Sequence, residues 1–220
     1  MGLVRLLRDA ALQPLGTTYL LLVLAFFVTG GKPYYAAGLV PLLLAAGAQP
    51  FLDRARRPWV APALLALSAP VALVVLPVLP VRSAGPVVAL NYDAGETVGW
   101  PELVTQVAAA HRLLPPGTAV LTGNYGQAGA VDRYGAELGL PRAFSGHNGY
   151  GLWGSPPGTA PVLAIGVPDE VLQRACRELR HLGELTSPFG IENDEHGTAI
   201  SFCIPRRPWR ELWPEVRHLG

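Results

Sequence analysis

Residues 59–81 read WVAPALLALSAPVALVVLPVLPV and carry no charged side chain. A membrane-spanning helix needs roughly 17–25 mostly apolar residues, and this stretch is long enough to form one. Two more apolar blocks precede it, whereas the residues that follow it have the composition of a water-soluble α/β protein. The sequence therefore predicts a transmembrane region over residues 1–82 and a globular domain over residues 83–220.

The two earlier blocks extend the membrane prediction to three transmembrane helices, at about residues 13–29, 36–52 and 59–81. Prolines fall inside the second and third blocks at Pro41, Pro62, Pro70 and Pro77. Proline is tolerated in membrane helices where neighbouring helices satisfy the freed carbonyl groups. We therefore expect these helices to pack against other membrane helices rather than to stand alone in lipid.

The basic residues predict the orientation in the membrane. Arg5 and Arg8 precede the first block and three arginines lie within residues 54–57, whereas the loop between the first two blocks carries only Lys32. Positively charged loops stay on the cytoplasmic side. The prediction is a multi-pass protein of the cell membrane, with a cytoplasmic amino terminus and an extracytoplasmic domain. The alternative is that the first block is a cleaved signal peptide, but no A-x-A site follows it and two more apolar blocks do.

The extracytoplasmic part alternates between helical and strand patterns. Helices are expected over 101–114, 127–138 and 169–182, strands over 118–123 and 161–167, and a terminal hairpin from Ile191 and 198–204. Strands that alternate with helices predict a small, mostly parallel α/β sheet covered on both faces. The tail, PRRPWRELWPEVRHL, fits either the membrane interface, where tryptophan is favoured, or packing on its own domain.

Charge and cysteine usage narrow the partners and the chemistry. The net charge is +1 and the arginines form no basic stripe, so no nucleic-acid partner is predicted. Cys176 and Cys203 fall on a predicted helix and a predicted strand that can pack together. An extracytoplasmic domain can hold a disulfide between them, although two buried thiols fit the sequence equally well. The histidines show no metal-ligand spacing, so neither a metal site nor a cofactor is predicted.

The segment TGNYGQAGAVDRYG, residues 122–135, follows a predicted strand and is rich in glycine. Its GxxGxxG spacing differs from the dinucleotide fingerprint, so the glycines serve either an anion site or simply a tight turn. Asn124 and Tyr125 lie where α/β domains place their ligands, beyond the carboxyl end of a strand. We therefore retain both as candidate ligand-binding residues.

A second candidate cluster lies in FSGHNGYGLWGSPPG, residues 144–158. His147, Asn148, Tyr150 and Trp153 crowd a stretch that is too rich in glycine for a regular helix or strand. Aromatic rings stack on the apolar faces of pyranoses while amides bond their hydroxyl groups, so this mixture favours sugar or acceptor binding. The alternative is a structural loop that contains a hydrogen-bonded histidine.

Lys32 is the only lysine in the chain, against sixteen arginines. It lies in the predicted extracytoplasmic loop, beside Pro33, Tyr34 and Tyr35. Lysine binds phosphate as a point charge, without the fixed fork of arginine. A lipid phosphate is thus a candidate ligand of this loop; the alternative is that Lys32 and the tyrosines are ordinary interface anchors.

Three strings carry a resemblance to a known family. GGKPYYAAGLVPLLLAAGA, residues 30–48, resembles the KPYY-type segment of bacterial family 39 glycosyltransferases, the relatives of protein O-mannosyltransferases and of the lipid A aminoarabinose transferase. GNYGQAGAVDRYGAELGLPRAFSGHNGYGLWG and ISFCIPRRPWRELWPEVRH resemble the carboxy-terminal extracytoplasmic domain of actinobacterial members. The resemblance covers nearly the whole chain.

This resemblance implies a membrane enzyme that transfers a sugar from a polyprenyl-phosphate donor to an acceptor on the outer face. It implies that Lys32 lies close to the donor phosphate, with Tyr34 and Tyr35 as weaker candidates. The family's catalytic acid belongs to an amino-terminal half that has no counterpart here, and the nearest external acids are Asp93 and Glu96. We therefore expect the carboxy-terminal portion of a transferase, incomplete on its own and partnered by an amino-terminal half or other membrane helices. The alternative function is a membrane-anchored extracytoplasmic glycan-binding module without transfer activity, and a third alternative is a degenerate, inactive fragment.

Overall fold

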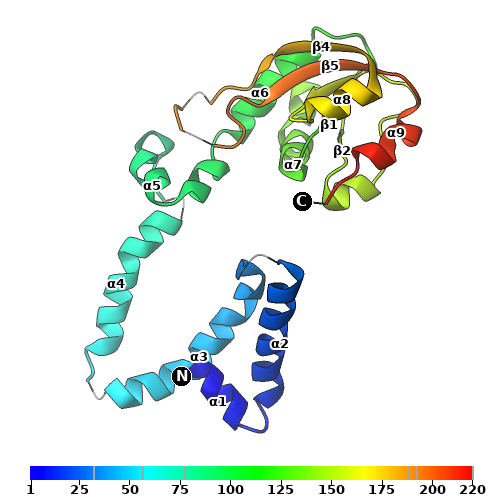
Figure 1. The fold of residues 1–220 in the computed structure, drawn as a ribbon. Coiled ribbons are helices and arrows are strands. Elements are labelled where there is room, and N and C mark those ends of the chain that lie inside the picture. The colour runs from blue at the N-terminus through cyan, green and yellow to red at the C-terminus, as the bar shows by residue number, and fades with distance from the viewer. Residues whose placement is uncertain (32, 56, 77, 188, 192, 220) are drawn as a thin grey trace. The chain divides into compact units, whose positions relative to one another are not determined.

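The computed structural model describes residues 1–31, 33–55, 57–76, 78–187, 189–191 and 193–219. The chain divides into two compact units, Met1–Ala72 and Leu73–Gly220. Among the described residues the first unit consists of helices, and the second is built around a β-sheet (Figure 1).

The apolar blocks of the first unit form the helices that their composition predicts. Helix α2 spans Gln13–Thr29, a 3₁₀ segment η1 (Pro33–Leu39) leads into α3 (Val40–Ala55), and α4 spans Val60–Val75. Within the described residues, one helical stretch is long and apolar enough to cross a membrane, the 22 residues Tyr34–Ala55, while α2 and α4 are shorter apolar helices. Helix α4 ends before the predicted limit at residue 81.

A short helix that the sequence analysis did not predict, α1 (Gly2–Arg8), packs against α2 and α3. Glycines make the close approach possible, because a Cβ on Gly2 would collide with the carbonyl oxygen of Leu43. Leu6 is 1% exposed in this contact, and Nη1 of Arg5 donates to the carbonyl oxygen of Ala46 at 3.2 Å. Small residues at helix contacts are typical of packing between membrane helices.

The second unit begins with short helical segments: η2 (Val81–Ser83), α5 (Gly85–Leu90) and η3 (Tyr92–Thr97). Nδ2 of Asn91 donates to the carbonyl oxygen of Val74 at 3.1 Å. Val74 and Asn91 both belong to the second unit, so this bond lies within that unit and holds the last turn of α4 there. The boundary between the compact units accordingly falls inside α4, ahead of the boundary at residue 82 that composition suggested.

The sheet has five strands in the order β2-β1-β3-β5-β4. The strands are β1 (Ala119–Thr122), β2 (Ala143–Ser145), β3 (Val162–Ile165), β4 (Cys176–Glu184) and β5 (Ala199–Pro205). Strand β1 pairs in parallel with β2 and β3, but β5 pairs antiparallel with both β3 and β4. The α/β class is therefore correct, whereas the expectation of a mostly parallel sheet is wrong because half of the strand pairs are antiparallel.

Helices cover both faces of this sheet. Helices α6 (Trp100–His111) and α7 (Tyr125–Tyr134) bury one apolar cluster against Val120, Leu163 and Ile165. Helices α8 (Asp169–Ala175) and α9 (Trp209–Val216) bury a second cluster against the alternate residues of the same strands, such as Leu121 and Ala164. Strands buried on both faces are expected to be largely apolar, as β3 is throughout and β1 is up to Thr122.

The region 169–204 differs from the sequence prediction. The expected helix over 169–182 ends at Ala175, and Cys176–Glu184 is instead the edge strand β4. The partner of β5 is this strand rather than Ile191, so the predicted hairpin had the wrong first strand. The spacing of Val171, Leu172, Ala175, Cys176 and Leu179 fits a helix, but pairing with β5 outweighs that local preference.

The aromatic tail packs on its own domain. Trp209 in α9 is fully buried, and its Nε1 donates to the carbonyl oxygen of Ala160 at 2.9 Å. Nε1 of Trp213 donates to the carbonyl oxygen of Gly151 at 2.9 Å. Of the two alternatives for this tail, the structure has the one in which the tryptophans belong to the domain core. Two 3₁₀ segments, η4 (Ala136–Leu138) and η5 (Asn148–Leu152), complete the fold.

Candidate functional site

A crevice lies at the carboxyl ends of β1 and β3. After β1 the chain enters α7 on one face of the sheet, and after β3 it enters α8 on the other face. The two loops therefore diverge between neighbouring parallel strands, which is where ligands bind in open α/β sheets. The cavity there holds about 220 Å³ and is lined by residues that follow β1, β2 and β3 and by the end of α9.

Glycines set the inner end of this crevice. A Cβ on Gly123 would collide with the carbonyl oxygen of Gly166, and a Cβ on Gly146 would collide with that of Val216. The glycine-rich turn after β1 therefore permits close backbone packing, which is the tight-turn alternative for this segment. Gly123 and Gly146 also line the crevice.

Asn124 caps α7. Its side chain accepts from the backbone N–H of Gln127 at 2.8 Å, and Gln127 Oε1 accepts from the Asn124 N–H at 3.3 Å. Glu195, 7% exposed, accepts from Nδ2 of Asn124 and from Nε2 of Gln127, at 3.2 and 2.6 Å. The polar atoms of Asn124 are thus used within the fold, which argues for a structural role.

Tyr125 and His147, which belong to two separate candidate clusters in the sequence, lie in ring contact, and His218 joins them. The ring centroids of Tyr125 and His147 are 4.8 Å apart, and those of His147 and His218 are 4.6 Å apart and stacked. The carboxy-terminal segment is held there by the backbone, since the N–H of Asn148 donates to the carbonyl oxygen of His218 at 2.9 Å. No local pattern pointed to His218, because only tertiary folding brings the tail to residues 146–148.

Both ring nitrogens of His147 are buried and lack a hydrogen-bond partner among the described residues. Burial lowers the pKa of His147, and the nearby His218 lowers it further. These surroundings favour the neutral form of the ring. A buried polar group without a partner is uncommon in folded proteins and calls for an explanation.

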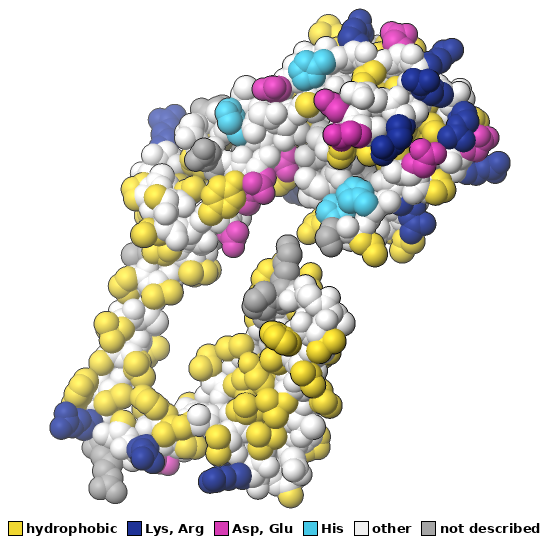
Figure 2. All heavy atoms as spheres, viewed as in Figure 1, with side chains coloured by type: hydrophobic (Ala, Val, Ile, Leu, Met, Phe, Trp, Pro, Cys, Tyr) yellow, Lys and Arg dark blue, Asp and Glu magenta, His cyan; other side chains and the backbone are white. Residues whose placement is uncertain are grey.

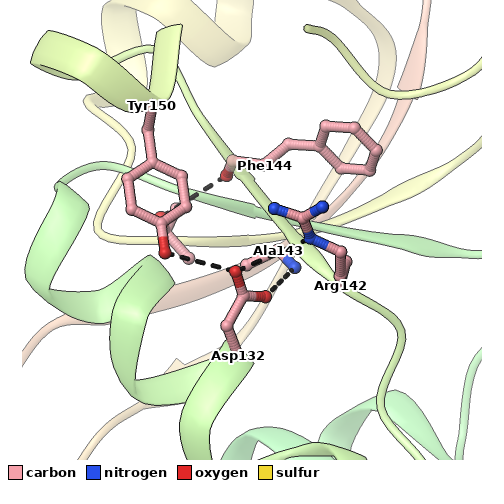
Figure 3. A network of polar contacts seen from close by, with 6 residues as sticks. Asp132, Arg142, Ala143, Phe144 and Tyr150 are labelled. Atoms are coloured by element: carbon pink, nitrogen blue, oxygen red, sulfur yellow. Dashed lines mark hydrogen bonds and ion pairs between the residues drawn. The ribbon is translucent and has the colours of Figure 1, made fainter. Parts of the chain in front are cut away.

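Tyr150 and Trp153 form a second aromatic contact, with centroids 4.5 Å apart. Figure 3 shows the network beside them: the Tyr150 hydroxyl donates to Oδ2 of Asp132 at 3.2 Å, and the backbone N–H of Ala143 donates to Oδ1 at 2.9 Å. Burial, with the Asp132 carboxylate as a further cause, raises the pKa of Tyr150. Trp153 is 66% exposed, so its ring is open to solvent.

Asp132 and Arg142 were missed by the sequence analysis. Nε of Arg142 lies 3.8 Å from Oδ2 of Asp132, and its guanidinium carbon lies 6.0 Å from the Trp153 ring centroid. Asp132 is the eighth residue of α7, and Arg142 directly precedes β2. The only signal for this pair in the sequence was a charged residue, Asp132, on the side of α7 that packs on β2. That signal can be recognised only when β2 is known to pair with β1.

Asn148 is the one described non-glycine residue with a positive φ, 49°. Such backbone strain is tolerated best by asparagine, aspartate and histidine. It lets the chain turn from β2 into η5, directly after the segment that pairs with the tail. Asn148 therefore has a role in the course of the backbone beside any role in binding.

Of the phosphate-binding candidates, Lys32 lies outside the described residues. Tyr34 and Tyr35 lie in η1 and are 62% and 53% exposed. Their rings contact edge-to-face at a centroid distance of 5.1 Å, and Tyr35 also contacts Phe26 of α2 at 5.4 Å. Both tyrosines are thus presented at the start of the helical stretch that is long enough to cross a membrane.

Cys176 and Cys203 form a disulfide between β4 and β5, with Cα atoms 5.6 Å apart. Of the candidate acids after the third apolar block, Glu96 accepts from the backbone N–H of Asp194 at 2.8 Å, and Tyr92 donates to Oδ1 of Asp194 at 2.7 Å. Burial raises the pKa of Glu96, and the Asp194 carboxylate contributes in the same direction. Glu96 is therefore engaged in a contact that joins η3 to the 193–196 turn.

Within the described part of the chain, no group of three or more histidine, cysteine, aspartate or glutamate side chains is placed to hold a metal ion. Comparisons of the sequence and the structure with protein-family models, with curated proteins and with solved structures found no match. The function therefore has to be argued from the chain's own residues.

Proposed function

We propose that this chain is the carboxy-terminal portion of an integral-membrane glycosyltransferase that uses a polyprenyl-phosphate-linked sugar on the outer face of the membrane. The transferase part of the proposal comes from the resemblance of residues 30–48 and of the second unit to family 39 glycosyltransferases, and the observation that carries its membrane part is the exposed apolar surface of α2, α3 and α4. Large side chains are more than half exposed on all three helices, including Phe27 at 85%, Leu44 at 67% and Leu65 at 72%. Figure 2 shows apolar side chains covering the visible faces of these helices.

Water-soluble monomers rarely expose contiguous apolar patches beyond a few hundred Å². Helices that are apolar all round belong in lipid or against other membrane helices. The proposal is that α2, the stretch Tyr34–Ala55 and α4 all span the membrane, with tilt or flanking residues making up the length of the shorter two. An open groove along α1, α3 and α4, lined by Leu43, Phe51 and Leu64, leaves room for further helices of the same bundle.

The disulfide supports an extracytoplasmic position for the second unit, because disulfides persist in oxidising compartments and are rare in the cytosol. Together with the arginines at residues 54–57, this favours a cytoplasmic amino terminus. The loop that contains Lys32 then lies at the outer membrane surface. There, the ammonium group of Lys32, close in sequence to Tyr34 and Tyr35, suits the phosphate of the lipid donor.

The proposed transfer is a substitution at the sugar. An acceptor hydroxyl oxygen attacks the anomeric carbon, the bond from that carbon to the phosphate oxygen breaks, and polyprenyl phosphate leaves with the electron pair. Lys32 stabilises the negative charge of the leaving phosphate. The hydroxyl proton passes to a carboxylate base, which we assign to membrane helices that pack against this chain, since Glu96 is engaged by Asp194.

The test is transfer of radiolabelled mannose from polyprenyl-phosphate mannose in membranes of the native host, with the chromosomal copy replaced by variants of the full chain. Lys32→Ala removes a charge-assisted contact of roughly 1.5–3 kcal/mol, so we expect transfer to fall about ten- to hundredfold. Lys32→Arg should give an intermediate rate. Arg82→Ala is the matched control, since it removes another cation on the same predicted side. Equal rates for wild type and Lys32→Ala would refute the assignment.

A second candidate function is a membrane-anchored glycan-binding module without transfer activity. The exposed Trp153 ring, flanked by Tyr150 and Arg142, favours it, because such a ring offers a stacking surface for a pyranose. The same membranes distinguish the two. Donor-dependent transfer that disappears when the whole chain is deleted supports the transferase, whereas unchanged transfer on deletion supports the binding module.

A further inference from the structure

We infer that the crevice between the carboxyl ends of β1 and β3 is a binding site for one uncharged sugar ring. This inference rests on the second unit alone and does not depend on the proposed transfer reaction. The site differs from the Trp153 surface, which the sequence pattern singled out, because neither Tyr150 nor Trp153 lines it.

The first step is the topology. The loops after β1 and β3 diverge to opposite faces of the sheet and so open a crevice between them. The course of the backbone alone produces this crevice, whatever side chains line it. The volume of about 220 Å³ lies below the roughly 300–1,000 Å³ of pockets for drug-sized ligands. A single small ring fits this space, and an oligosaccharide would have to extend out of it.

The second step is the chemistry of the three polar side chains that line the crevice, all of which offer acceptors when the imidazole of His218 is neutral. Thr122 Oγ1 already donates its proton to the carbonyl oxygen of Asn124 at 2.9 Å. His218 Nδ1 lies 3.1 Å from the carbonyl oxygen of Val216 and donates to it, so Nε2 is the acceptor in the neutral form of the ring. Glu215, the third, is a carboxylate.

Three acceptors call for a ligand that donates several hydrogen bonds. Phosphates and carboxylates only accept, and none of the lining residues is a lysine or arginine that would neutralise an anion. The charge of Glu215 is already paired with Nη2 of Arg207 at 3.1 Å, which removes the need for a cationic ligand. Hydroxyl groups on an uncharged molecule therefore suit this site best.

The third step is the apolar wall. Val167, Pro168, Val171 and Val216 supply the remaining surface of the crevice. A sugar ring presents C–H groups on its faces and hydroxyls around its edge, so it can contact valine side chains and hydrogen-bond to the three acceptors at once. The ring of His147 stacks on the ring of His218, with centroids 4.6 Å apart, and so supports the orientation of the His218 imidazole.

The test is binding of methyl glycosides to the full chain in lipid nanodiscs, which avoids glycoside detergents that would compete. Saturation-transfer difference NMR and calorimetry with methyl α-mannopyranoside, methyl α-glucopyranoside and methyl α-arabinofuranoside are expected to detect binding of at least one. Val171→Phe fills the crevice and should abolish that binding. His218→Phe keeps the stacked ring but removes the acceptor, and should weaken binding about tenfold.

Matched substitutions outside the crevice serve as controls. Leu113→Phe adds a ring at an exposed position, and His181→Phe removes an exposed imidazole from β4; both should bind as wild type does. If Val171→Phe unfolds the domain, as tryptophan fluorescence would report, His218→Phe decides. The inference is overturned if no glycoside binds, if ethanolamine binds in its place, or if Trp153→Ala abolishes binding that Val171→Phe and His218→Phe leave intact.

Discussion

His147 is a residue whose surroundings favour its uncharged form. Burial and the neighbouring His218 both lower its pKa, and both of its ring nitrogens are buried without a described partner. The unfolded chain, in which histidine has a pKa near 6.5, therefore takes up a proton at a higher pH than the folded chain does. Below about pH 6.5 the unfolded state binds more protons, so the folded state loses stability as the pH falls.

We predict that His147→Phe flattens this dependence. Phenylalanine keeps the ring contacts with Tyr125 and His218 but carries no titratable group and no buried polar atom. The thermal midpoint of the full chain, followed by tryptophan fluorescence, should be equal or higher at pH 7.5 and should decline less between pH 6.5 and pH 5 than that of wild type. His181→Phe on the edge strand is the control, and its decline should match wild type. Parallel curves for His147→Phe and wild type would contradict the assignment.

At the scale of elements, β4 is a strand because of its partner. Arg177, Glu178, Arg180 and His181 are all exposed along it, and charged edge strands of this kind resist pairing with other chains. Register shifts interrupt its pairing with β5 near both ends. The disulfide from Cys176 to Cys203 fastens the start of β4 to the sheet, and both cysteines are almost fully buried.

We predict that this disulfide contributes roughly 3 kcal/mol to the stability of the second unit, because it closes a loop of 27 residues in the unfolded chain. Urea unfolding of the full chain in detergent, followed by the fluorescence of the buried Trp209 and Trp213, should shift to lower urea when dithiothreitol is added. The double variant Cys176→Ala with Cys203→Ala should unfold at the same urea concentration as reduced wild type, and dithiothreitol should not change that concentration. A midpoint that dithiothreitol leaves unchanged in wild type would mean that the bond carries no stability.

The whole molecule combines a unit of exposed apolar helices with a unit that has its own buried core. If the proposed topology is correct, the carboxyl terminus lies outside the cytoplasm. Alkaline phosphatase folds only in an oxidising compartment, whereas green fluorescent protein folds in the cytoplasm, so the two reporters distinguish the sides.

We predict that fusion of alkaline phosphatase after residue 219 gives an active enzyme in a bacterial host, and that green fluorescent protein at the same position stays dark. Fusions after Arg57, within the arginine-rich loop, should show the opposite pattern. The fusion proteins should also remain in the membrane pellet after extraction with alkaline carbonate. Active phosphatase at Arg57, or release of the chain by carbonate, would contradict the three-helix topology.

A site residue could be predicted from the sequence where its neighbours in the chain already marked it, and could not where the site joins segments that are distant in the chain. Tyr125 and the cluster of His147, Tyr150 and Trp153 were found from composition, because aromatic and polar residues on glycine-rich loops stand out in the sequence. The crevice residues Val167, Glu215 and His218 come from segments far apart in the chain, and none of them is unusual locally. Asn124 was assigned to a ligand, yet its capping bonds and its contact with Glu195 depend on the fold.

The sequence by itself determined where the apolar helices lie, that the remainder is an α/β domain, and the positions of β1, β3, α6 and α7. These follow from local patterns of apolar residues, which set which face of each element must be buried. Only the tertiary structure decided that residues 176–184 are a strand, that β5 runs antiparallel to β3, and that the tail returns to close the crevice. The physical reason is that strand pairing and cavity formation depend on contacts between residues distant in the chain, and those contacts outweigh local preference.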